Sequence, residues 1–223
     1  MDFGLSFSYV FKDKEWFGKV AVPALCSLIP VVGPFVVIGW GLKATKNVID
    51  GYVENALPKL DFGADLGRGF MAWLITAIYS LPVAIVVGIS GSLFGFADGV
   101  YEEAFRVILM IVGGCFGLFG FLLALLIGLM GMAGVANYVA KGQFGAAFKF
   151  KEVFGLLKKS FVSWLLVLVG GFIAMGIIAP LGTIVCIIGA LFTSAYATAV
   201  YSHLLGQAYN KSATPVLAEV EVL

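Results

Sequence analysis

Few side chains in this sequence could do chemistry, and they form no known catalytic pattern. The single histidine, His203, lies near the end of the last apolar run, with no nucleophile or metal ligand at a useful spacing. Asp98, Glu102 and Glu103 are close together, but acidic residues between two apolar runs are typical of a solvated loop. The sequence holds no phosphate-binding loop, nucleophile elbow or dinucleotide fingerprint. We therefore expect no enzyme, no catalytic residue, no metal site and no cofactor.

The ionisable residues also argue against ion-coupled transport. Coupled transporters keep acidic or basic groups deep in the membrane, because such costly groups are retained there only for a function. No long apolar run of this chain has one in its interior. The sequence still allows passive transport of a solute or lipid. A polar path for it would include Asn137, His203 and Gln207, near Ser194, Thr198 and Ser202. The cysteines Cys26, Cys115 and Cys186 lie within apolar runs and give no disulfide framework.

The composition identifies the solvent around most of the chain. Of its 223 residues, 61% are hydrophobic and only 12% are charged. Soluble domains carry about 25% charged residues, and a soluble core of this size could not cover so much apolar surface. The formal net charge of +1 predicts no nucleic-acid partner. The chain is therefore expected to lie in a membrane, with lipids as its first partners.

The last apolar run, Ser160 to Ser202, contains no charged residue across its 43 positions. One straight helix of that length would measure about 64 Å, which is twice the roughly 30 Å thickness of a bilayer core. A fold-back is expected within residues 179–182, because proline removes a backbone donor and glycine accepts turn dihedrals. The run then predicts two crossings.

Small residues recur at every fourth position of the second arm. Such a row lets another helix come close, which is how helices associate where lipid removes the hydrophobic driving force. The row drifts around the helix by about 40° per step, which favours a crossing partner over a parallel one. The predicted helix-packing residues are Gly182, Cys186, Ala190, Ser194, Thr198, Ser202 and Gly206.

The first uncharged run, residues 20–42, is long enough for one crossing but is interrupted in its middle. Pro30, Gly33 and Pro34 form a turn signal within five positions. Each arm is then about ten residues long, or half a bilayer. We predict a re-entrant hairpin that turns at these three residues. A single kinked crossing is the alternative, so whether residues 20–42 span or re-enter stays open.

The remaining segments alternate between interfacial and spanning patterns. Residues 2–19 fit a helix lying in the membrane interface, although an alternating pattern also allows a strand. Residues 69–140 are expected to form a central pair of crossing helices around the acidic loop 98–106. Glycines within 91–99 fit either a loop or a packing face. Residues 141–159 are basic and amphipathic, as in another interfacial helix.

A short internal repeat suggests one unit used twice, in residues 3–57 and 141–210. Its clearest match aligns FKDKEWFG at 11–18 with FKFKEVFG at 148–155. Each copy precedes an apolar run with a proline–glycine break. The interval from motif to break is about twice as long in the second copy, so we expect a shallow hairpin first and a spanning one second.

The distribution of charged segments between the two sides of the membrane favours a re-entrant first run. With a re-entrant first run, the basic segments 12–19, 43–68 and 141–159 share one side and the acidic loop lies opposite, as the positive-inside rule requires. The sequence thus predicts a single all-α domain, 1–223. It would be a polytopic membrane helix bundle with one re-entrant hairpin, about four transmembrane helices and interfacial amphipathic helices. We expect it in the cell membrane, with both termini cytoplasmic.

Three motifs resemble those of a known family. They are FKDxxW at 11–16, IPxxGP at 29–34 and YxHLxGQxY at 201–209. They are similar to the markers of a family of prokaryotic multi-helix membrane proteins that is classified as a domain of unknown function. The resemblance covers nearly the whole chain and implies a membrane helix bundle. It implies no activity and no site residues.

We therefore predict a non-enzymatic integral membrane scaffold or accessory subunit that assembles through small-residue helix faces and shapes the membrane around it. Its expected partners are membrane lipids and either a second copy of itself, in a homo-oligomer, or another membrane protein. The alternative is a passive channel or a carrier of a small molecule or lipid.

Overall fold

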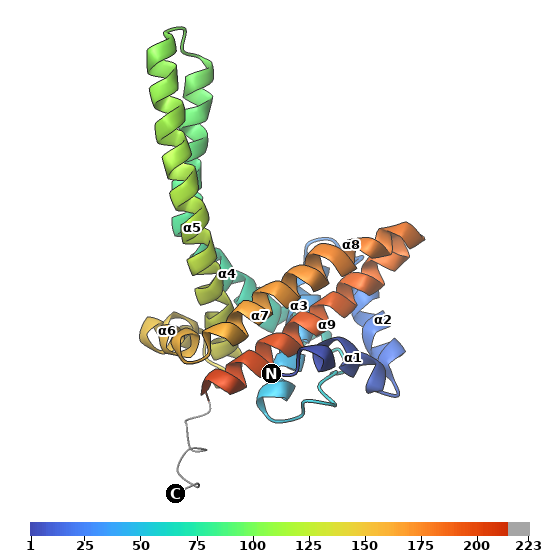
Figure 1. The fold of residues 1–223 in the computed structure, drawn as a ribbon. Coiled ribbons are helices and arrows are strands. Elements are labelled where there is room, and N and C mark those ends of the chain that lie inside the picture. Colours follow the sequence, from blue (N-terminus) through green and yellow to red (C-terminus); the bar gives the residue numbers. More distant parts are fainter. Residues whose placement is uncertain (214–223) are drawn as a thin grey trace, which may run out of the picture. The chain divides into compact units, whose positions relative to one another are not determined.

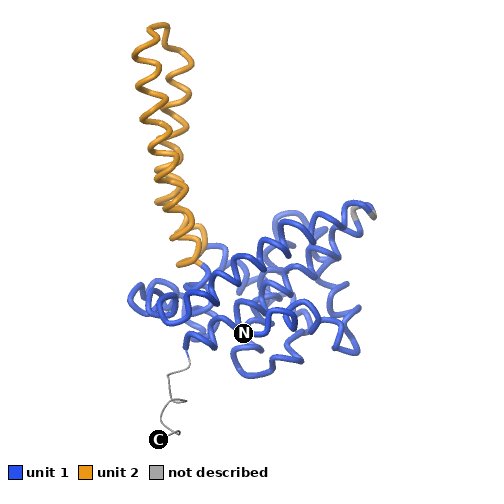
Figure 2. The backbone as a smooth tube through the Cα atoms, viewed as in Figure 1, with its two compact units in different colours: residues 1–75, 132–223 blue, residues 76–131 orange. Residues whose placement is uncertain are grey.

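The computed structural model describes residues 1–213, apart from the side chains at positions 185 and 187. These residues are helical or connect helices, and no strand occurs among them. The predicted all-α class is therefore confirmed. The chain forms two compact units: unit 1 comprises residues 1–75 and the chain from residue 132 on, and unit 2 comprises residues 76–131 (Figure 2).

Unit 1 is organised around its last helix, α9 (Cys186–Ala213). Figure 1 shows the other helices of the unit laid against it, and α9 contacts α1, α2, α3, α6, α7 and α8. Those helices are α1 (Phe3–Lys12), α2 (Trp16–Cys26), α3 (Val32–Ile49), α6 (Phe150–Lys159), α7 (Phe161–Gly171) and the short α8 (Ala179–Leu181). The 3-10 turns η1 (Phe144–Phe148) and η3 (Gly182–Val185) and the π-helical turn η2 (Phe172–Ile178) connect them.

Two long helices, α4 (Phe62–Asp98) and α5 (Glu103–Lys141), belong to both units. Unit 2 consists of their residues 76–131 with the loop between them, and the start of α4 and the end of α5 belong to unit 1. Within unit 2 the two helices pack closely along α5 glycines. A Cβ at Gly120 would lie 3.1 Å from a Val87 methyl group, and the Ser90 hydroxyl donates to the Gly113 carbonyl at 2.7 Å. Small residues thus let the two backbones approach, as is usual for membrane helices.

Three helices among the described residues are long and apolar enough to cross a membrane: Phe62–Asp98, Glu103–Lys141 and Phe161–Ile184. We expected about four. The missing one is the second arm of the last run, now α9. Its small hydroxyl-bearing residues and His203 lower its hydropathy, and many of them are buried against other helices of unit 1 instead of facing lipid.

The fold-back of the last run lies later than expected. Residues 179–182 continue the helix that begins at Phe161, and Pro180 lies between the π-helical turn η2 and the 3-10 turn η3. The chain reverses at Cys186, which has a φ of 66°. Gly182 still has a close contact, because a Cβ there would lie 2.3 Å from the Gly189 carbonyl oxygen of α9.

The N-terminal lead is a helix, so the strand alternative for residues 2–19 is wrong for this segment. Asp2 caps α1, where its Oδ1 accepts a hydrogen bond from the Leu5 amide at 2.8 Å. The copies of the repeated motif are followed by different elements. The first leads directly into the hairpin arm α2, whereas the second leads into α6, and α7 follows. The interval is longer in the second copy mainly because its arm is longer: α7 and η2 span residues 161–178, whereas α2 ends at Cys26.

Candidate functional site

His203 lies at the centre of a buried polar cluster between α9, α1 and the loop after α3. Its Nδ1 is 2.9 Å from the Ser6 hydroxyl and 3.0 Å from Gln207 Nε2, and its Nε2 is 2.8 Å from the Val53 carbonyl oxygen. The ring also stacks on Tyr9, with centroids 4.2 Å apart. We call Asp2, Ser6, Val53, His203 and Gln207 the His203 cluster.

The hydrogen bonds of the cluster fit a neutral histidine. A carbonyl can only accept, so Nε2 carries the proton and donates to Val53. Nδ1 is then an acceptor, and the Ser6 hydroxyl donates to it. The Gln207 side chain binds the Asp2 peptide at two points: its Nε2 donates to the Asp2 carbonyl at 2.9 Å, and its Oε1 accepts from the Asp2 amide at 2.6 Å. The cluster therefore fixes the start of α1 to α9.

Asn137, the third residue of the expected polar path, belongs to a different cluster. Its Nδ2 donates to the Ala146 carbonyl at 2.8 Å and to Glu152 at 3.3 Å. Glu152 also pairs with Lys141, and this hydrogen bond lowers the pKa of the Glu152 carboxyl. The structure thus brings His203 and Gln207 together but joins Asn137 to α6 and η1. Each of the three is engaged with the protein's own groups.

Different parts of the predicted row of small residues pack against different elements. Its C-terminal half packs against α3: a Cβ at Gly41 would lie 2.6 Å from the Ser202 hydroxyl oxygen, and one at Gly206 would lie 2.7 Å from Val48 Cβ. The Thr45 hydroxyl donates to the Ser202 carbonyl at 2.9 Å. Thr198 also lies against α3, because the same Cβ at Gly41 would be 2.7 Å from its methyl group. In the remainder of the row, Gly182 packs on α9 itself, Ala190 and Ser194 are half-buried, and Cys186 is exposed.

The predicted turn at Pro30, Gly33 and Pro34 joins α2 to α3. Val31, in its middle, has φ 66° and ψ −51°, and the Val32 amide donates to the Pro30 carbonyl at 2.7 Å. This is the geometry of a γ-turn, which is strained for a β-branched residue. A Cβ at Gly33 would lie 2.1 Å from the Cys26 carbonyl oxygen, so only glycine lets the two arms meet there.

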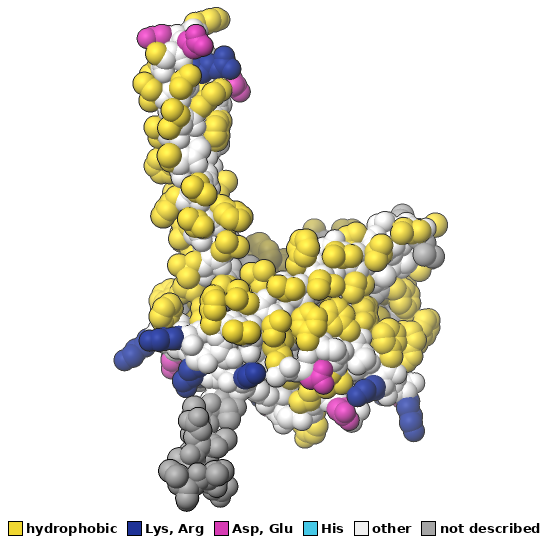
Figure 3. All heavy atoms as spheres, in the orientation of Figure 1, with side chains coloured by type: hydrophobic (Ala, Val, Ile, Leu, Met, Phe, Trp, Pro, Cys, Tyr) yellow, Lys and Arg dark blue, Asp and Glu magenta, His cyan; other side chains and the backbone are white. Residues whose placement is uncertain are grey.

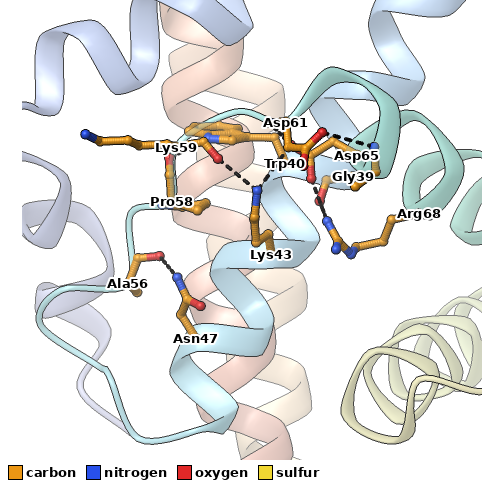
Figure 4. A network of polar contacts seen from close by, with 11 residues as sticks. Gly39, Trp40, Lys43, Asn47, Ala56, Pro58, Lys59, Asp61, Asp65 and Arg68 are labelled. Atoms are coloured by element: carbon orange, nitrogen blue, oxygen red, sulfur yellow. Dashed lines mark hydrogen bonds and ion pairs between the residues drawn. The ribbon is translucent and has the colours of Figure 1, made fainter.

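A buried ionic site that the sequence did not lead us to expect lies where α3 crosses the start of α4 (Figure 4). The Asp65 carboxylate is 0% exposed; Arg68 Nη1 donates to its Oδ1 at 2.5 Å, and the Asp61 amide donates to its Oδ2 at 2.8 Å. Lys43 Nζ is 3.7 Å from Oδ2 and donates to the Lys59 carbonyl at 2.9 Å. The i,i+3 spacing of Asp65 and Arg68 was a visible signal, but the contact with Lys43 was not.

The buried polar groups of unit 1 stabilise the fold through hydrogen bonds. No buried side-chain nitrogen or oxygen in the described part of the chain lacks a hydrogen-bond partner. Across the same residues, no group of three or more His, Cys, Asp and Glu side chains could hold a metal ion. Charged side chains gather along one edge of unit 1 in Figure 3, and hydrophobic ones cover most of the rest of the visible face of this unit. These features fit a protein embedded in a membrane.

Comparisons with known proteins found a family model and a relative. Residues 23–187 match a family model described as a protein of unknown function, DUF4013. The chain is also similar to the uncharacterized protein MJ1189 of Methanocaldococcus jannaschii, with 30% identity over 176 residues that cover 77% of this chain. The matched region is 58% of that relative's length. No solved structure matches the chain.

Proposed function

We propose a function from the exposed helix faces of the chain, because it belongs to the DUF4013 family, for which no activity is assigned. The protein is a non-enzymatic integral membrane scaffold or accessory subunit that associates with a second copy of itself or with another membrane protein. It lies in the cell membrane with both termini on the cytoplasmic side, and it shapes the lipid around it.

The supporting observation is a glycine face on α4 in unit 2. Gly88, Gly91 and Gly95 lie on one side of the helix, all three are exposed, and a Cβ at any of them would meet no atom within 4 Å. Each glycine within a helix costs roughly 0.5–1 kcal/mol relative to alanine. In α5, Gly113, Gly117 and Gly120 recover this cost by packing on α4, whereas Gly88, Gly91 and Gly95 have no such contact with the described part of the chain. Close approach of another membrane helix would supply it.

Replacing glycines on this face should weaken assembly. We expect Gly91→Leu with Gly95→Leu to convert an associated form into the monomer, because two branched side chains would hold a partner backbone away. Native mass spectrometry of the full chain in nanodiscs measures the stoichiometry. Ile89→Leu, at an exposed position on the same helix but off the glycine face, is the matched control. Unchanged association in the double variant would contradict the proposal, as would a wild-type protein that is monomeric and carries no partner.

The tips of both hairpins in unit 1 support insertion from one side of the membrane. Val31 at the first tip is 75% exposed, and Ile184 at the second is 79% exposed. Their neighbours Leu28, Ile29, Leu181 and Ile188 are also exposed. A helix pair that crosses completely ends in residues that water can solvate, as unit 2 does with Asp98 and Glu102. We infer that both hairpin tips end within the hydrocarbon, where they displace lipid. The first tip lies about half a bilayer deep, and the second lies near the far side of the hydrocarbon core, because Phe161–Ile184 is long enough to cross it.

The native Cys186 thiol can test where the second tip lies. In liposomes, a variant that retains only this cysteine should react with a membrane-permeant maleimide but be protected from a charged one on either side, because a charged reagent does not enter hydrocarbon. Tyr101→Cys in the cysteine-free background is the control, since Tyr101 is 104% exposed in the acidic loop. It should react with the charged reagent from one side. Labelling of Cys186 by the charged reagent would show a complete crossing.

A further inference from the structure

A shallow groove opens in unit 1 beside the first turns of α2. Its volume is about 330 Å³. Gly18 contributes open space, because a Cβ there would meet no atom within 4 Å. The groove combines charged and apolar walls, and the residues that line it are Glu15, Gly18, Lys19, Val22, Lys59 and Leu60.

Two ammonium groups line the groove, and each has donors to spare. Lys59 Nζ lies 3.1 Å from a Glu15 carboxylate oxygen, and both side chains are mostly exposed. Such surface pairs contribute only about 0–1 kcal/mol, so an anionic ligand can compete for the lysine. Lys19 Nζ binds Asp13 at 2.5 Å, and both are mostly buried. An ammonium group has three donors, so Asp13 fixes Lys19 in place and leaves donors for a ligand.

The rest of the groove lining includes the apolar residues Val22 and Leu60, and its apolar surface continues along α2. Val22 lies in the groove and Leu25 follows it, at i+4 and i+7 from Gly18, so the three share one helix face. Both Val22 and Leu25 are exposed. The face leads away from the lysines toward the apolar hairpin tip at Val31. One end of the site therefore suits a negative headgroup and the other a hydrocarbon chain.

We propose that this groove binds a single membrane phospholipid. Its phosphate lies between Lys19 and Lys59, and one acyl chain follows Val22 and Leu25 along α2. Charge complementarity selects the phosphate, and continuity with the apolar surface of α2 selects a lipid over free phosphate, which would leave that surface uncovered. The proposal is independent of helix assembly in unit 2, because the site lies entirely within unit 1.

Lipid retention by the full chain tests the site. In detergent, native mass spectrometry with dioleoyl phosphatidylglycerol should show one lipid per chain. Dioleoylglycerol, which lacks the phosphate, should be retained about tenfold less, the loss expected for charge-assisted hydrogen bonds. Inorganic phosphate should not compete at equal concentration. Equal retention of dioleoylglycerol would show that the lysines do not select the ligand, and efficient competition by phosphate would show that the site is not a lipid site; either result overturns the proposal.

Two substitutions locate the site. Gly18→Trp should fill the groove and abolish specific retention while leaving the fold intact, because its side chain enters open space. Gly155→Trp is the matched control: Gly155 occupies the equivalent position of the repeated motif, also has open space at its Cβ, and lies outside the groove. Lys59→Gln should weaken retention about tenfold, whereas Lys14→Gln, an exposed lysine outside the lining, should not. Equal retention by both tryptophan variants, or equal loss in both lysine variants, contradicts the assignment.

Discussion

Gly69→Ala is expected to destabilise the protein, whereas Gly67→Ala, two residues earlier on the same helix, is not. A Cβ at Gly69 would lie 1.8 Å from the Phe35 carbonyl oxygen, and one at Gly39 would lie 1.8 Å from the Asp65 carbonyl oxygen. Helices α3 and α4 therefore cross with their backbones in contact. A methyl group cannot fit without separating them, and overpacking of this kind costs about 1–3 kcal/mol, occasionally more.

The comparison is sharp because Gly67 meets no atom within 4 Å. Alanine there gains helix propensity, worth up to about 1 kcal/mol. The free energy of unfolding in mixed micelles, measured by titration with a denaturing detergent, should fall for Gly69→Ala and stay the same or rise for Gly67→Ala. Similar losses in both variants would mean that glycine flexibility matters here and the close crossing does not.

Asp65→Asn is expected to have the other large effect. The Asp65 carboxylate is fully buried and compensates Arg68 and Lys43, whose side chains are 30% and 29% exposed. Removing one partner of a buried ion pair costs about 3–5 kcal/mol, because the remaining charge is left without compensation. Because water partly reaches both cations, we expect the loss of stability to lie at the lower end of this range, about 3 kcal/mol. The same unfolding titration measures it.

Asp50→Asn is the matched control for this prediction. Asp50 pairs with Lys46 on the surface, where both side chains are 42% exposed, so its loss should cost less than about 1 kcal/mol. If Asp65→Asn unfolds no more easily than Asp50→Asn, the ionic site does not hold α3 against α4. A drop in stability restricted to Asp65→Asn would identify this crossing as a main support of unit 1.

Properties that depend on local composition followed from the sequence. The absence of charge over long runs set the membrane class and the all-α fold, because a backbone in hydrocarbon must satisfy its own hydrogen bonds. The first turn was found at Pro30 and Gly33, since two prolines around a glycine exclude a continuous helix. Residues 179–182 looked similar but remained helical, because the π-helical turn before Pro180 and the 3-10 turn after it let the backbone adjust around the proline.

Which surfaces meet was decided only by the tertiary structure. The sequence indicated that the row from Gly182 to Gly206 packs against a helix. It did not indicate that Ser202 and Gly206 would pack on α3 of the same chain. Partners of His203 and Gln207 lie about two hundred positions earlier, at Ser6 and Asp2 respectively. Likewise, Lys43 meets Asp65 only because Gly39 and Gly69 let α3 and α4 touch. Such contacts depend on how distant helices cross, and spacing along one helix does not encode the identity of the helix that will lie against it.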